Sequence, residues 1–258
     1  MRLSNRIRVV INLVILGISI LAWVLLLTNP GQIMSVEHCQ ISDSGPSLEA
    51  IEMIVQMNPL LSQLTGWTLM VIAMMLPKLI LPIQHIYSTS LNRTRFTSAL
   101  LFVSGYVFVW VVIGIFMIAV TFGLHVLTPA SYLPVIVFSV IVIIWQFSPI
   151  KQRFLNYGHI HKVLPAFGLA TFQCAFLYGV THGIWCVGAG WALMLLPMIF
   201  PSGHNLAMII VTFIMISEHL EHPKIPSWGL NFRSKLFRLI SARIQIRFKY
   251  LFNIELVL

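Results

Sequence analysis

Two residues with metal-binding side chains lie one helical turn apart in an apolar stretch of the sequence. His182 and Cys186 are four positions apart, so a helix places both side chains on one face. Imidazole and thiolate are ligands that suit Cu(I) and Zn, and a histidine within a membrane is a candidate functional residue. The alternative is structural: His182 hydrogen-bonds to a neighbouring helix, and Cys186 packs as a small apolar side chain.

Further candidate ligands lie in other apolar segments. Met70 and Met74 share a helix face, and thioethers bind Cu(I), although a row of methionines in an apolar helix more often serves packing. Glu218 stands one turn before His222, which suggests a metal or proton-relay pair or, alternatively, a polar helix end at the membrane interface. The predicted metal-ligand set is His182, Cys186, Met70, Met74, Met194, His204 and Glu218.

The composition indicates the kind of element that must position these residues. Of 258 residues, 58% are hydrophobic and only 9% are charged, against ~25% charged in soluble domains. This balance excludes an ordinary cytosolic protein, a disordered chain and a protein that reads nucleic-acid sequence. Three cysteines cannot form a disulfide framework.

A helix that crosses a bilayer needs ~20 mainly apolar residues. Six such segments are expected, at 7–28, 61–82, 96–124, 132–147, 176–200 and 204–220. The predicted fold is an all-α polytopic membrane protein with six transmembrane helices. It divides into an N-terminal anchor helix (1–28), an extracytoplasmic loop (29–60), a five-helix membrane domain (61–222) and a basic cytoplasmic tail (223–258).

The charges predict the orientation of the chain. With the N-terminus inside, all 16 Lys and Arg residues fall in inner segments or at inner helix ends. All the Lys, Arg, Asp and Glu residues in the long outer loop are acidic. This distribution follows the positive-inside rule and predicts that both termini are cytoplasmic. The basic tail is expected to be attracted to anionic lipid.

A short sequence recurs in the second and fifth segments. Gly66-Trp-Thr-Leu-Met70 resembles Gly190-Trp-Ala-Leu-Met194. Each half of the chain would contain three helices. Because three is an odd number, two equivalent halves would have opposite orientations in the membrane, as in the 3+3 inverted repeats of many transporters. Trp67 would then be equivalent to Trp191. The alternative is chance likeness between two apolar segments.

Several blocks occur in the order found in a known family. They are Trp67-x-Leu-Met-x-x-Ala-Met-Met-x-Pro77, Gly105-Tyr-x-x-x-Trp110, Gln146-x-x-Pro-x-Lys151, His182-Gly-x-x-Cys186-x-Gly188-x-x-Trp191-Ala-Leu-Met194, and Gly203-x-Asn205-Leu206 with Glu218. Over roughly residues 65–229 the chain resembles the bacterial membrane family called domain of unknown function 2182, described as predicted metal-binding integral membrane proteins. The resemblance implies a protein of the bacterial inner membrane.

The chain departs from that family at several positions. Two cysteine pairs of the family are replaced here, one by Phe154 and Gly158 and the other by Ala189 and Gly190. His204 stands where the family has Met, and His219 where it has Lys. His182, Cys186, the methionines and Glu218 remain as the candidate set.

The leading hypothesis is therefore a membrane protein that binds or handles a transition metal within the helix bundle. Copper is the expected ion, and zinc is the second candidate. A structural or assembly subunit of a larger membrane complex and a secondary transporter of a small solute are the alternatives. No nucleophile elbow, P-loop, GxGxxG or CxxC is present, which favours a protein that is not an enzyme. The expected partners are the bilayer and subunits of a membrane complex, with no nucleic acid.

Overall fold

Helices make up nearly all the regular structure in the computed structural model of the chain. It describes residues 4–28, 60–127, 133–160, 162, 164–165, 169–200, 203–229 and 238–246, and no strand occurs among them. All of the predicted outer loop (29–60) except its last residue, and the tail positions 230–237 and 247–258, lie outside the described residues.

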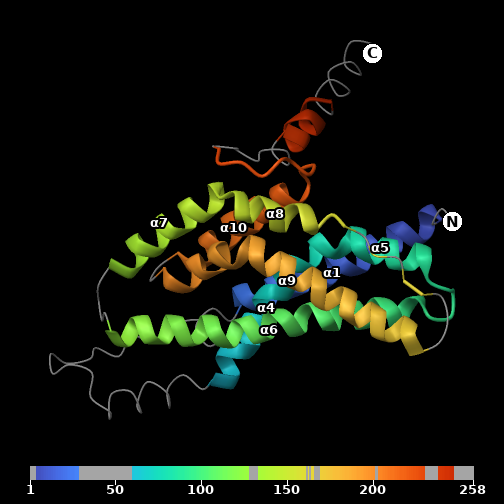
Figure 1. Cartoon of the computed structure of the whole chain (residues 1–258), viewed down its shortest axis with the longest axis horizontal. Helices are drawn as coiled ribbons and strands as arrows, with labels where there is room; N and C mark the ends of the chain where they lie inside the picture. Colours follow the sequence, from blue (N-terminus) through green and yellow to red (C-terminus); the bar gives the residue numbers. More distant parts are fainter. Residues whose placement is uncertain are drawn as a thin grey trace.

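A helix is found at each of the six apolar segments (Figure 1). The first is α1 (Asn5–Thr28), and the second is divided into α4 (Leu60–Met75), the 3-10 turn η1 (Leu76–Leu79) and α5 (Ile80–Thr89). The others are α6 (Arg95–Leu127), α7 (Leu133–Phe147) with α8 (Pro149–Tyr157), α9 (Leu169–Ile199) and α10 (His204–His219).

The described helices give four to five candidate membrane spans. Asn5–Thr28, Leu60–Thr89, Arg95–Leu124 and Leu169–Ile199 are each long and apolar enough, and the bent pair of α7 and α8 is a fifth candidate. Helix α10 is apolar but has only 16 residues, and at 1.5 Å per residue it is shorter than a ~30 Å hydrocarbon core. The six predicted crossings are therefore confirmed only in part.

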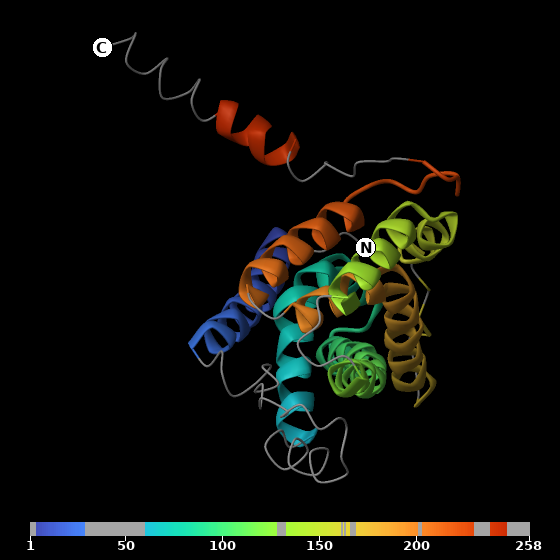
Figure 2. The same cartoon turned by 90° about the vertical axis from the view of Figure 1, so that its left-hand side faces the viewer.

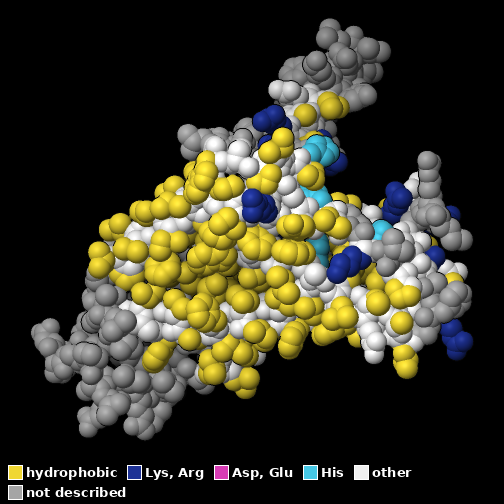
Figure 3. Space-filling model, in the orientation of Figure 1, with side chains coloured by type: hydrophobic (Ala, Val, Ile, Leu, Met, Phe, Trp, Pro, Cys, Tyr) yellow, Lys and Arg dark blue, Asp and Glu magenta, His cyan; other side chains and the backbone are white. Residues whose placement is uncertain are grey.

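The surface of the molecule agrees with the assignment of these helices as candidate membrane spans. Apolar side chains form a broad area across the helices on the face shown in Figure 3, while Lys, Arg and His side chains gather toward the upper and right-hand parts of that view. A surface of this kind is suited to contact with lipid.

Helix α9 lies at the centre of the arrangement. Figures 1 and 2 show α6 on one side of it and α7, α8 and α10 on the other. The contact with α6 is the most extensive, and glycines make it close: a Cβ built at Gly105 would lie 2.4 Å from the Phe176 carbonyl oxygen, and one at Gly179 would lie 2.1 Å from that of Phe102. The two backbones therefore touch, as small residues allow in membranes.

Proline interrupts the second span. Because Pro77 has no N–H and its ring clashes with the preceding turn, regular α-helical bonding ends at Met75 and resumes at Ile80. The 3-10 turn between them contains Lys78, whose side chain points into the bundle with only 7% of the residue exposed.

A second interruption divides α7 from α8, which bend by 62°. Ser148 caps α8 by accepting a hydrogen bond from the Ile150 N–H at 3.1 Å, and Pro149 is the first helical residue. Serine at the N-cap followed by proline is a strong helix start. The sequence predicts that the chain leaves the membrane after Phe147, so α8, the second helix of this α7–α8 elbow, was not predicted.

Candidate functional site

Cys186 lies where three structural elements meet. Its Sγ atom accepts a hydrogen bond from the Tyr106 hydroxyl of α6 at 3.1 Å and one from the Lys78 ammonium of η1 at 3.4 Å. The residue is the eighteenth of the 31 in α9, so its sulfur lies near the middle of the longest candidate spans. The 3-10 turn after Pro77 and the close α6–α9 contact together bring these polar atoms to one point.

His182 lies one turn earlier on the same helix and is only 5% exposed. Three aromatic rings surround it, with ring centroids 5.8 Å away at Phe102 and 6.1 Å away at both Tyr106 and Tyr178. The Tyr178 hydroxyl is buried and has no hydrogen-bond partner among the described residues. Tyr106 thus contacts both candidate ligands, which places His182 and Cys186 in one buried environment.

The candidate methionines belong to the core that surrounds this environment. Met70, Met74 and Met194 are fully buried and share one core cluster, against which Cys186 packs. Met194 is eight residues beyond Cys186, or about 12 Å along the helix axis. Met194 is therefore poorly placed to share one metal ion with the Cys186 sulfur, whereas Met74 lies one helical turn before Lys78, whose ammonium contacts that sulfur.

His204 is the first residue of α10 and contacts the C-terminal part of α9. Its Nδ1 atom donates to the Pro197 carbonyl at 2.6 Å, and its Nε2 atom is buried without a hydrogen-bond partner among the described residues. A metal-binding histidine commonly donates one ring N–H to a carbonyl and offers the other nitrogen to the ion. Pro197 is 11 residues beyond Cys186, so His204 belongs to a separate region of the bundle.

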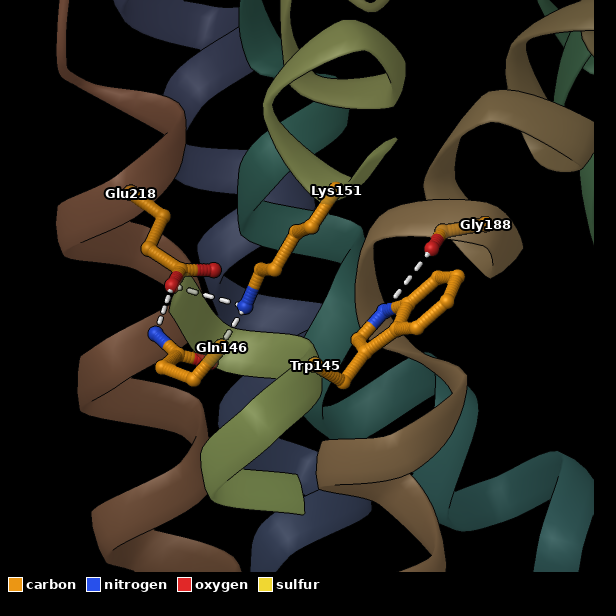
Figure 4. Close-up of polar contacts among 5 residues, drawn as sticks. All are labelled: Trp145, Gln146, Lys151, Gly188 and Glu218. Carbon is orange, nitrogen blue, oxygen red and sulfur yellow. Dashed lines mark hydrogen bonds and ion pairs between the residues drawn. The ribbon is translucent and has the colours of Figure 1, made fainter. Parts of the chain in front are cut away.

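Glu218 pairs with Lys151, which the sequence analysis had counted as a cytoplasmic charge and as part of a family block. The Lys151 Nζ lies 2.8 Å from Glu218 Oε1, with 0% and 2% of the two side chains exposed. Lys151 also donates to Gln146 Oε1 at 2.5 Å, and the Gln146 amide donates to Glu218 (Figure 4). The structure thus joins two of the family blocks, and an acidic residue alone in an apolar helix was the signal that could have predicted a buried partner.

The α7–α8 elbow also contacts α9. Trp145 Nε1 donates to the Gly188 carbonyl at 3.2 Å, as Figure 4 shows, and a Cβ at Gly188 would lie 2.5 Å from the Phe154 ring. Gly188 is two residues from Cys186, and residues two apart do not share a helix face, so the α7–α8 pair contacts α9 at this level on a different face from the candidate ligand.

Three further histidines among the described residues have contacts other than Cys186. His159 stacks on His219 with ring centroids 5.6 Å apart, and His85 Nε2 lies 3.1 Å from the Lys162 carbonyl oxygen. His161 lies outside the described residues. In the described part of the chain, no three His, Cys, Asp or Glu side chains form a group that could hold a metal ion.

The helices and their apolar surface define a polytopic helical membrane protein. Residues 64–229 match the family model described as PpoB2: copper chaperone, and the chain belongs to this family. The match agrees with the resemblance drawn from the sequence motifs and supports a copper-related membrane protein. Searches of curated proteins and of solved structures found no match.

Proposed function

We propose that the chain binds Cu(I) as its cargo between α6 and α9 and delivers it to a partner protein in the bacterial inner membrane. The observation that carries the proposal is the position of Cys186, a partly buried residue whose sulfur contacts Tyr106 of α6 one turn from the buried His182. The family match to copper chaperones supports the choice of ion. Thiolate, imidazole and thioether are the soft ligand set that suits Cu(I), with Zn(II) as the second candidate.

In this proposal Cys186 and His182 bind the ion first, and Met70 or Met74 supplies a third ligand. Met194 lies further along α9 and His204 begins α10 beside Pro197, and both provide later ligands during release. Glu218 is the weakest candidate, because its carboxylate already accepts hydrogen bonds from Lys151 and Gln146. Metal binding releases any proton on the sulfur, since the thiolate is the ligand.

We also propose that the α7–α8 pair and α10 are the fourth and sixth crossings, with both termini cytoplasmic. The inward placement of all 16 basic residues supports this topology. The 3+3 inverted repeat remains a hypothesis. The two tryptophans that define it have different neighbours, since Trp67 contacts Trp110 whereas Trp191 contacts Trp145.

Elemental analysis of the detergent-purified chain under reducing conditions tests the metal proposal. We expect about one copper per chain, largely lost in Cys186→Ser and His182→Ala variants that remain monodisperse. Cys174→Ser is the matched control, because Cys174 is also a partly buried cysteine of α9 packed against the core, and it should retain its copper.

Two outcomes would contradict the proposal. Full copper occupancy in the Cys186→Ser variant would move the site elsewhere in the bundle. A parent chain without copper or zinc would favour a structural subunit of a membrane complex, which stable co-purifying proteins would support, or a transporter of another small solute.

A further inference from the structure

Lys78 is a buried cation without a carboxylate partner in the described part of the chain. The described acidic residues are Glu218 and Glu221, and each pairs with another lysine, Lys151 and Lys224 respectively. The Lys78 ammonium donates to the Cys186 sulfur at 3.4 Å. A full positive charge therefore lies beside the atom that we propose binds the metal.

The buried location of the Lys78 ammonium strengthens its electrostatic effect on an ion bound to Cys186. Lys78 is 7% exposed and follows Pro77 in the 3-10 turn, and Cys186 lies near the middle of α9. Buried charges are screened by salt and water much less than exposed ones. A cation bound to the sulfur would thus experience the ammonium at close range in a medium of low polarity.

The repulsion depends on the charge of the arriving ion. When Cu(I) replaces the proton of a thiol, an S–H bond breaks, an S–Cu bond forms and the proton leaves to solvent, so one positive charge leaves and one arrives. A divalent ion in the same exchange leaves the site one unit more positive. If the sulfur carries no proton beforehand, both ions add charge, but the divalent ion still adds one unit more.

We infer that Lys78 is a specificity-determining residue that makes the Cys186 site select a monovalent over a divalent metal ion. The inference rests on the proposed Cu(I) site and adds the reason why a thiol and histidine site would prefer copper to zinc. Cation charge, rather than ligand softness, is the property that Lys78 discriminates. The Tyr106 hydroxyl, which also donates to the sulfur, carries no charge and contributes no such preference.

Ag(I) and Cd(II) separate charge from softness, since both bind thiolates well and they differ by one charge. For the detergent-purified full chain, affinities for Cu(I), Ag(I), Zn(II) and Cd(II) are measured at one pH by competition with chelators of known affinity. The parent chain should bind the two monovalent ions far more tightly than the two divalent ions. Tight Cd(II) binding by the parent chain would overturn the inference without any variant.

The variants test the residue itself. Lys78→Met removes the charge while keeping an unbranched side chain, and Lys78→Gln is the second neutral variant if the first does not fold. Either should raise the affinity for Zn(II) and Cd(II) roughly tenfold to a hundredfold more than that for Cu(I) and Ag(I). Lys78→Arg, which keeps the charge, and Lys224→Met, which removes an exposed one, should preserve the parent ratio.

An equal change for all four ions in the neutral variants would overturn the inference and leave the copper proposal intact. Binding that weakens for the monovalent ions alone would overturn it as well, because Lys78 would then assist Cu(I) binding directly. A parent chain that binds none of the ions would refute the copper proposal and this inference together.

Discussion

Replacing Glu218 by Gln removes the negative charge of the buried pair with Lys151 while keeping the shape of the side chain and an oxygen that accepts hydrogen bonds. Both side chains are almost fully inaccessible, and their charged atoms are 2.8 Å apart. Removing one partner of a buried ion pair costs about 3–5 kcal/mol, because the other charge stays buried without compensation. For a chain of this size, each kcal/mol of lost stability lowers the melting temperature by about 2–4 °C, so we expect a melting temperature lower by about 6–20 °C.

The assay is thermal unfolding in detergent, with a partly exposed pair as the internal control. Lys224 and Glu221 approach to 2.6 Å, but 46% of the Lys224 side chain is exposed, so Glu221→Gln should change stability by less than about 1 kcal/mol. Replacing Lys151 by Met together with Glu218 by Leu should recover most of the lost stability, because no unpaired charge remains. Equal shifts for Glu218→Gln and Glu221→Gln would refute the reasoning.

Two further predictions concern packing and topology. Gly179→Ala should destabilise the chain by about 1–3 kcal/mol, since the new Cβ would meet the Phe102 carbonyl oxygen at 2.1 Å, whereas Gly123→Ala, with no atom within 4 Å, should be neutral or slightly stabilising; melting temperatures distinguish the two. A cysteine at position 45 should be labelled from outside the cell by an impermeant thiol reagent, and one replacing Arg93 only from the cytoplasm. Labelling of the Arg93 position from outside would contradict the proposed topology.

Apolar runs and charges in the sequence were sufficient to predict the helices, because membrane helices are selected by local hydrophobicity. A helix was found at each expected segment. The interruptions were harder to predict: Pro77 indicated that the second helix breaks, but neither the 3-10 turn nor the continuation to Thr89 follows from proline alone. The α8 elbow was missed because Ser148 and Pro149 are typical of a loop as well as of a helix start.

The partners of the candidate ligands could not be predicted, because they come from other helices. Counting Lys78 and Lys151 as inner-facing charges satisfied the topology rule, yet both side chains are buried beside candidate ligands, Cys186 and Glu218. Charge balance could have suggested one of these contacts, since an isolated acid in an apolar helix needs a cation. The contact with Cys186 depends on the packing of η1 against α9 and leaves no signal in the sequence.

Helix α10 has 16 residues, which corresponds to a length of about 24 Å. Crossing the membrane as proposed, it is several ångströms shorter than a ~30 Å hydrocarbon core. Lipids beside α10 therefore have to compress, while those beside α6 and α9 do not. This hydrophobic mismatch makes the α10 side of the protein the favourable place for a partner helix, because covering it relieves the deformation of the lipid.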